Sequence, residues 1–322
     1  MSISVKIIAD SLTQHGDRLT TMILKYPRII HSEFMTHRLF SRNSASSRAV
    51  PFKKMVESVK KNPFIPIKFQ KEHPGMQGDE CFEGKEHDAC VKQWLAARDA
   101  AIKNAESLNS FKVTKQLCNR LLEPFMYHTV IITSSDYENF FSLRAEGAAE
   151  IHIQELAHKM LEAYNESEPQ KLRAREWHIP FGNEIDIIRI RALVKDATIE
   201  SFNEIRIKIA TARCARVSYL NYEGKDDYEA DIALFDRLSK SGHFSPFEHC
   251  ARVMTFQERD MWTRTIPDPR NILPYIIQGA WCGNFQGFIQ LRKELPDENR
   301  KDNRVIKKTY EEDKKKVSSQ MG

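Results

Sequence analysis

The stretch from residue 33 to 48 constrains this chain more than any other. Residues 36–48 carry one imidazole, three guanidiniums, four serine hydroxyls and one amide, and no acid follows Glu33 to neutralise them. Serine hydroxyls and guanidiniums bind phosphate oxygens, and an arginine fork can bind two oxygens at once. Because the apolar pairs Ile29–Ile30 and Phe34–Met35 come before the polar run, we expect the run to begin where a buried element ends. The sequence therefore predicts an anion site at the edge of a core, with a polar surface loop as the plainer alternative.

The spacing within this stretch resembles the signature of the flavin-dependent thymidylate synthases, written R-H-R-x-x-S-x-N-x-x-S-x-R. Six of its seven specified positions match, and these are His37, Arg38, Ser41, Asn43, Ser46 and Arg48. The chain departs from the family at Thr36, where Arg is usual, and Glu33 stands where Gln is usual. These two departures leave open which pyrimidine nucleotide the chain would accept.

Further blocks resemble the same family. Residues 119–125 and 139–144 resemble its R-x-x-x-P and N-F-x-x-L-R elements, and residues 212–219 and 241–249 resemble its A-R-x-S-Y and G-H-x-[ST]-P-[FL]-E-H elements. In the family the last two elements come first, so the chain is predicted to be circularly permuted. Permutation is tolerated where the ends of a domain lie close together at its surface. Residues 241–249 should then lie beside the stretch at 33–48.

The resemblance implies a role for each matching residue. The implied flavin-binding residues are His37, Arg38, Ser41, Asn43, Asn139, His243, Ser245 and Glu248. The implied nucleotide-binding residues are Glu33, Ser46, Ser47, Arg48, Arg120 and Arg144. Arg144 would polarise the uracil, and Arg144 and Ser46 are the implied catalytic residues.

Methylation of a uracil needs a bound nucleotide, a one-carbon donor and a hydride, and side chains cannot supply the hydride. The resemblance implies FAD as cofactor, with NADPH and methylenetetrahydrofolate as cosubstrates, and the conversion of dUMP to dTMP in a homotetramer. The chain has no GxGxxG loop, so FAD is not expected to bind in the Rossmann manner. Two alternatives stay open. One is a related flavin- and folate-dependent modification, either hydroxymethylation or a reaction on dCMP, and the other is a nucleic-acid-binding protein with strongly salt-dependent binding.

The apolar patterns predict both strands and helices. The resemblance implies an α/β (α+β) fold, in which a twisted and mainly antiparallel sheet packs against helices in an oligomer. We expect one catalytic domain over residues 1–294, with a surface insertion at about 53–90, and a polar, flexible tail over residues 295–322. The expected strands are residues 5–9, 19–24 and 129–133, the first two forming a hairpin. The expected helices are residues 29–40, 91–107, 145–164 and 230–238. His152 and His158 lie off the apolar stripe of the third helix, so both are expected to be exposed to solvent.

The remaining expectations concern location and metals. Six cysteines are scattered without a CxxC pair and no apolar run is long enough to span a bilayer, which favours a cytoplasmic protein with reduced thiols and no membrane. The net charge of +5 suits anionic ligands but is too small to predict a nucleic-acid partner. No metal is expected, because Cys81, His87 and Cys90 fit no common zinc spacing, and Pro246 breaks the helix that would align His243 with His249.

Overall fold

The computed structural model describes residues 2–73, 78, 80–194, 196, 198–219, 226–264, 283–295, 298, 311–312 and 314. Most of the predicted tail at 295–322 therefore lies outside the described residues. No described helix combines the length and the apolar character that a membrane span needs.

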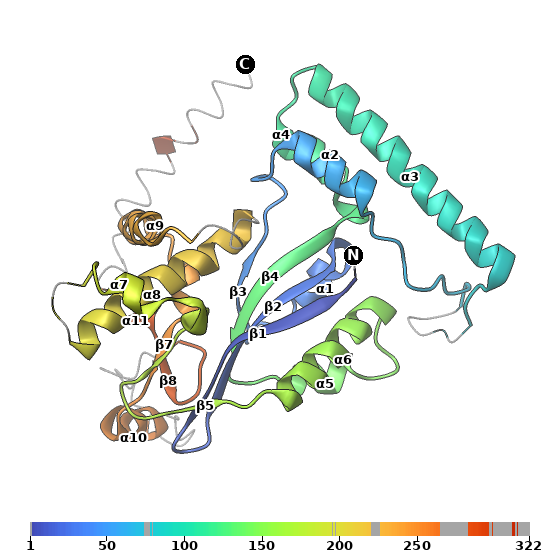
Figure 1. The fold of residues 1–322 in the computed structure, drawn as a ribbon. Coiled ribbons are helices and arrows are strands. Elements are labelled where there is room, and N and C mark those ends of the chain that lie inside the picture. The colour runs from blue at the N-terminus through green and yellow to red at the C-terminus, as the bar shows by residue number, and fades with distance from the viewer. Residues whose placement is uncertain are drawn as a thin grey trace.

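A twisted five-stranded sheet forms the centre of the fold (Figure 1). The predicted hairpin is confirmed, and its two strands are longer than expected. In the order in which they lie in the sheet, the strands are β3 (Ser41–Ser44), β4 (Tyr127–Ser134), β2 (Arg18–Pro27), β1 (Ser4–Thr13) and β5 (Gln170–Leu172). All neighbours are antiparallel except β1 and β5. The predicted fold class is thus confirmed.

Both faces of this sheet are covered, which explains why β2 and β4 are buried along most of their length. One face carries α1 (His31–Phe34), α5 (Glu138–Arg144) and α6 (Ile151–Glu166). The apolar side chains of α6 recur every three or four residues and so form one stripe against the sheet. The core on this face includes Met22, Leu24, Val130, Ile132, Phe140, Ile153, Leu156 and Met160.

The prediction that α6 presents His152 to solvent is wrong. His152 is buried, and its Nε2 accepts a hydrogen bond of 3.0 Å from the Ile67 amide, while its Nδ1 lies 2.5 Å from the Glu150 carboxylate. The reason is tertiary, because the segment around Ile67 passes over the start of the helix.

The other face of the sheet is covered by α8 (Ile199–Arg216) and by the loop around Phe181. Ile23 and Ile131 from the sheet pack there against Phe181, Cys214 and Val217. The remaining elements of this half are α7 (Ile187–Ile190), α9 (Tyr228–Ser241), α10 (Phe256–Arg264), α11 (Leu291–Glu294) and a three-stranded antiparallel sheet of β6 (Trp177–His178), β7 (Ala251–Val253) and β8 (Phe288–Gln290). Elements from the later part of the sequence therefore pack against a sheet whose strands come from residues 4–172.

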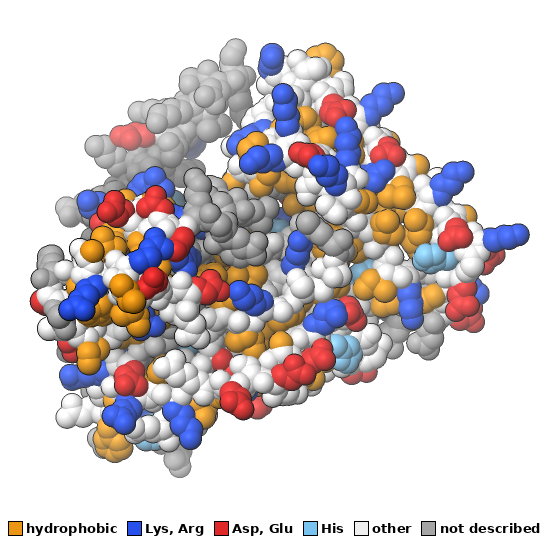
Figure 2. Space-filling model, viewed as in Figure 1, with side chains coloured by type: hydrophobic (Ala, Val, Ile, Leu, Met, Phe, Trp, Pro, Cys, Tyr) orange, Lys and Arg blue, Asp and Glu red, His pale blue; other side chains and the backbone are white. Residues whose placement is uncertain are grey.

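Three helices extend from the end of the sheet as an arm, and these are α2 (Phe52–Lys61), α3 (Gly84–Ser110) and α4 (Lys115–Arg120) (Figure 1). Basic and acidic side chains are interspersed over the arm (Figure 2). The predicted surface insertion differs here from a plain excursion, because α2 buries Met55, Val56 and Val59 against Ile102 of α3.

Candidate functional site

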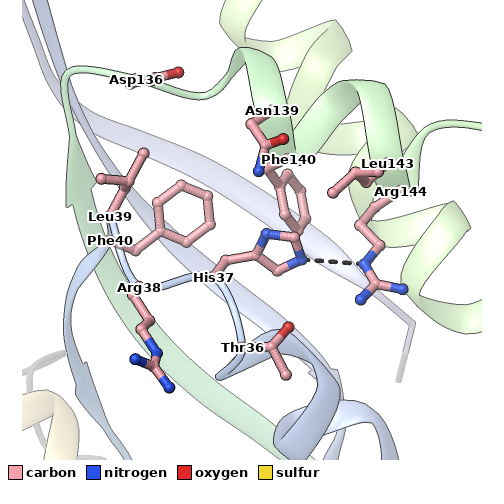
Figure 3. Close-up of a pocket in the computed structure, with 10 residues that line it drawn as sticks. All are labelled: Thr36, His37, Arg38, Leu39, Phe40, Asp136, Asn139, Phe140, Leu143 and Arg144. Carbon is pink, nitrogen blue, oxygen red and sulfur yellow. Dashed lines mark hydrogen bonds between the residues drawn. The ribbon is translucent and has the colours of Figure 1, made fainter.

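A pocket of about 200 Å³ lies between the segment after α1 and helix α5 (Figure 3). Its walls combine apolar side chains with cationic and amide groups. The lining residues are Thr36, His37, Arg38, Leu39, Phe40, Asp136, Asn139, Phe140, Leu143 and Arg144. Five of the predicted site residues belong to this pocket or contact it, namely His37, Arg38, Asn139, Arg144 and Glu33.

The backbone turns sharply just before the pocket. The helix predicted for residues 29–40 ends at Phe34, and two turns follow in which the amides of Thr36 and His37 bond the carbonyls of Glu33 and Phe34. The Thr36 hydroxyl also donates to the Glu33 carbonyl at 2.7 Å, which competes with continuation of the helix. As a result His37 points into the pocket, where its ring meets Phe140 edge-on at 4.8 Å between centroids.

Glu33, Arg144 and His37 form one hydrogen-bonded group. The Arg144 Nε donates to His37 Nε2 at 3.0 Å, and its Nη1 donates to Glu33 Oε1 at 2.5 Å. Burial, with the positive charges of Arg144 and Arg42, lowers the pKa of His37 to about 4. His37 is therefore neutral at pH 7, and because arginine only donates, the ring hydrogen lies on Nδ1. Two bonds fix the plane of the Arg144 guanidinium, while its Nη2 has no hydrogen-bond partner among the described residues.

Arg42 is a site residue that the sequence reasoning missed. It occupies an unspecified position of the signature, yet its Nη1 donates to the His37 carbonyl at 2.7 Å. Burial lowers the pKa of Arg42, while Tyr26 and Glu248 act in the opposite direction. Its positive charge contributes, after burial and Arg144, to the lowered pKa of His37. The available signal was that Arg42, the second of the three arginines in the stretch, stands at an unspecified position.

The predicted contact between the first and last blocks is found on the edge strand β3. The 3-10 turn Ser245–Glu248 lies against β3, and Asn43 Nδ2 donates to Ser245 Oγ at 3.0 Å across 202 positions of sequence. The Asn43 Oδ1 meets His249 Nε2 at 2.9 Å. Glu248 accepts from Arg292. Residues predicted from two distant blocks therefore meet on β3, the strand that follows the pocket-lining residues 36–40.

Ser41, one of the predicted flavin-binding residues, is held by polar side chains from the later part of the sequence. It is buried, and its hydroxyl lies 3.2 Å from Asn284 Oδ1 and 3.1 Å from Gln290 Nε2. Asn284 Nδ2 also donates to the Leu39 carbonyl at 2.6 Å. Asn284 and Gln290 hold the signature strand in place, and no pattern in the sequence had marked them.

The predicted phosphate-binding residues lie on the side of β3 nearer the arm. The Ser47 hydroxyl donates to Glu123 at 2.6 Å, and the Ser46 amide bonds the Ser218 carbonyl at 3.0 Å, which brings the 212–219 block to this segment. Arg48 and Arg120 are exposed. A second pocket of about 360 Å³ contains Arg120, and its other lining residues are Arg28, Ile29, His31, Ser32, Glu123 and Pro124.

His243 stands apart from the other predicted site residues. It is exposed, and its Nδ1 lies 2.8 Å from the Ser241 hydroxyl. Both ring nitrogens of His249 are engaged within the fold, by Thr133 and by Asn43. Within the described ranges, no three His, Cys, Asp or Glu side chains are grouped closely enough to hold a metal ion.

The geometry just described coincides with a family match. Residues 14–170 match the family described as thymidylate synthase complementing protein. This range holds the whole signature stretch and Arg144, and over it the resemblance to the flavin-dependent thymidylate synthases is confirmed. The block at 241–249 lies beyond it, and its relation to the signature rests on the contacts at β3.

Two solved structures are similar to this chain. They are crystal structures of a UMP/dUMP methylase, PolB from Streptomyces cacaoi, bound with 5-Br UMP and with 5-Br dUMP. Their sequence identities are 18% and 16%, and both have a TM-score of 0.42. Each match covers 51% of this chain, with 89% and 90% of the other chain. No curated protein sequence matches the chain.

Proposed function

We propose that this protein is an FAD-dependent enzyme that methylates dUMP to dTMP, with methylenetetrahydrofolate as carbon donor and NADPH as reductant. The observation that carries the proposal is the hydrogen bond between Asn43 and Ser245 on β3, the strand that directly follows the pocket-lining segment of His37. Those residues come from blocks that the family signature specifies and that lie far apart in this sequence. The family match over residues 14–170 supports the same assignment.

The side chains at the pocket fit a flavin by their chemistry. Arg38 supplies a cation for a diphosphate, and Asn43, Asn139 and Ser245 supply hydroxyl and amide groups for ring carbonyls and ribose. Neutral His37 can approach an uncharged ring without burying an unpaired charge. When bound, the flavin supplies the hydride that side chains cannot.

Arg144 is suited to act on the pyrimidine. Its fork is held by Glu33 and His37, and its remaining N–H groups can donate to a base carbonyl. A donor that is fixed in advance stabilises negative charge on that carbonyl as the reaction proceeds. Ser46, Arg48 and Arg120 would bind the phosphate, which does not change during the reaction.

One observation favours a second acceptor, dCMP. Glu33 replaces the usual amide of the family by a carboxylate, and it lies directly on Arg144. An ionised carboxylate only accepts hydrogen bonds, so it complements an exocyclic amino group better than a carbonyl. Hydroxymethylation in place of methylation remains the other related reaction.

Product analysis separates these reactions. The purified protein is incubated with FAD, NADPH and methylenetetrahydrofolate, and with dUMP or dCMP in separate reactions, and the nucleotides are analysed by mass spectrometry. We expect dTMP from dUMP, and none when FAD is omitted from protein stripped of flavin. Product from dCMP alone would favour the second acceptor, and absence of both product and flavin absorbance would contradict the proposal.

The nucleic-acid-binding reading makes a different prediction, namely DNA binding that falls steeply with salt and no flavin absorbance. The face shown in Figure 2 mixes basic and acidic side chains, and this mixture does not favour that reading.

We further propose that a homo-oligomer, as a tetramer, completes the site. The pocket is smaller than most ligand sites, which hold about 300–1,000 Å³. Two of its apolar lining side chains, Leu39 and Leu143, are about half exposed, at 46% and 54%. Light scattering on protein eluted from a size-exclusion column measures the oligomeric state. A monomer that retains full activity would contradict the proposal.

A further inference from the structure

A continuous chain of six hydrogen bonds runs along the face of the central sheet that α8 covers. It begins at Ser11 and ends at Ser245, one of the predicted site residues. It joins side chains from β1, β2, β3, β4, β6 and the turn at Ser245–Glu248 with the following His249. Its links are Ser11 Oγ to His178 Nδ1 (2.8 Å), His178 Nε2 to Thr21 Oγ1 (2.7 Å), Thr21 Oγ1 to Thr133 Oγ1 (2.7 Å), Thr133 Oγ1 to His249 Nδ1 (2.8 Å), His249 Nε2 to Asn43 Oδ1 (2.9 Å) and Asn43 Nδ2 to Ser245 Oγ (3.0 Å).

The amide of Asn43 gives this chain a direction. Its Oδ1 can only accept, so His249 must carry its hydrogen on Nε2 and accept at Nδ1. Thr133 then donates to His249, which leaves its oxygen to accept from Thr21. By the same reasoning His178 donates from Nε2 and accepts from Ser11.

The residues at the two ends of this hydrogen-bond chain, Ser11 and Ser245, favour the same direction. Ser11 is 3% exposed, and in this direction its hydrogen is used by His178. In the opposite direction the Ser11 hydroxyl hydrogen would have no acceptor among the described side chains, and a buried donor without a partner is costly. Ser245, at the other end, is exposed, so its hydrogen can meet water or a ligand.

Burial keeps both imidazoles in the neutral form that the chain requires. The rings of His178 and His249 are 1% and 0% exposed, and burial lowers the pKa of each to about 3. A neutral imidazole donates at one nitrogen and accepts at the other, so each ring passes the direction on. The two threonine hydroxyls do the same between them.

We propose that this chain turns the hydroxyl hydrogen of Ser245 outward, so that Ser245 is a hydrogen-bond donor to the bound ligand and His249 is the residue that positions it. Because Ser245 accepts from Asn43, its own hydrogen is free for a carbonyl or phosphate oxygen. The identity of that ligand as FAD rests on the proposed function, whereas the direction of the chain does not.

The direction can be measured without any ligand. Nitrogen NMR on protein labelled with ¹⁵N-histidine distinguishes the two neutral tautomers, and the signals are assigned with His178→Gln and His249→Gln. We expect both rings to carry hydrogen on Nε2 at pH 7. Hydrogen on Nδ1 of either ring, or a charged ring, would overturn the proposal.

The role of Ser245 is tested by FAD binding in a double-mutant cycle. Asn43→Asp replaces the donor to Ser245 by an acceptor, which would turn the Ser245 hydrogen inward and away from the ligand. We expect Asn43→Asp and Ser245→Ala each to weaken FAD binding roughly two- to tenfold, the effect of one lost hydrogen bond. The double variant should then bind no more weakly than the weaker-binding single variant, and fully additive losses would overturn the donor role.

His249 is tested by rescue. His249→Phe removes the donor to Asn43 and should weaken FAD binding, whereas His249→Gln restores an N–H near the same place and should recover most of it. Equal losses in both variants, with equal thermal stability, would overturn the positioning role. If the unmodified protein binds no FAD, the proposed function fails, and the histidine tautomers still decide the direction of the chain.

Discussion

Two hydrogen bonds hold the Arg144 guanidinium, one to His37 and one to Glu33. The role of this fixed group in catalysis can be separated from the role of a phosphate-binding arginine by kinetics. Removing a group that acts mainly in the transition state lowers the turnover number. Removing a group that binds substrate and transition state equally raises the Michaelis constant. Arg144 belongs to the first kind in our proposal and Arg48 to the second.

We therefore expect Arg144→Ala to lower the turnover number by roughly a hundredfold or more, the loss that follows removal of one stabilising donor. Arg48→Ala should chiefly raise the Michaelis constant for dUMP. Steady-state kinetics with the flavin content checked by absorbance measures both. Arg237→Ala, at an exposed position of α9, is the matched control and should leave both constants unchanged. Near-normal turnover in Arg144→Ala would show that the pyrimidine is polarised by another group.

At the scale of elements, the contact between β3 and the turn at Ser245–Glu248 depends on buried histidines that stay neutral. The pKa of His178 and of His249 is lowered from 6.5 to about 3 in the folded protein. Above pH 6.5 both rings are neutral whether the chain is folded or not. Below it the unfolded chain binds two protons that the folded chain does not, so stability falls as the pH falls toward 3.

Each such histidine should lower the free energy of unfolding by about 1.4 kcal/mol for each unit that the pH falls. The pair should therefore lower it by about 3 kcal/mol per unit between roughly pH 5.5 and 4. His31, His37 and His128 also have lowered pKa values and steepen the loss, whereas the raised pKa of Asp231 acts in the opposite sense. Urea unfolding at several pH values measures the slope. His249→Gln should reduce the slope by the contribution of one proton. An unchanged slope in His249→Gln would contradict the prediction.

At the scale of the whole molecule, α8 from the later part of the sequence covers one face of the central sheet, whose strands come from residues 4–172. Ile131 of β4 is fully buried and packs against Cys214 and Val217 of the later part. Because separation of the two parts would expose this face of the sheet to water, we expect the protein to unfold in one cooperative transition.

Ile131→Ala should lower the free energy of unfolding by about 2–5 kcal/mol, through lost burial and the cavity left behind. Ile188→Ala, at a position 83% exposed, should change it by no more than about 0.5 kcal/mol. Denaturant unfolding followed by circular dichroism and by tryptophan fluorescence measures both. Two separate transitions in the unmodified protein would contradict a shared core.

The amino-acid pattern by itself determined the elements and part of the site. Runs of β-forming residues predicted the hairpin of β1 and β2, and periodic apolar residues predicted α6 and α9. The blocks that resemble the family marked His37 and Arg144 as site residues, and the two are hydrogen-bonded in the structure. Such features are visible because they depend on residues close together in sequence, or on a motif whose members share one ligand.

Only the tertiary structure decided which polar groups are buried and what they contact. Thr21 and Thr133 look like ordinary strand residues, yet their hydroxyls join two histidines at the centre of the molecule. His152 was predicted to be solvated, and Ser41 was assigned to the cofactor, but segments distant in sequence cover both. Burial and hydrogen-bond partners depend on contacts between remote segments, and the local pattern of a sequence carries no record of those contacts.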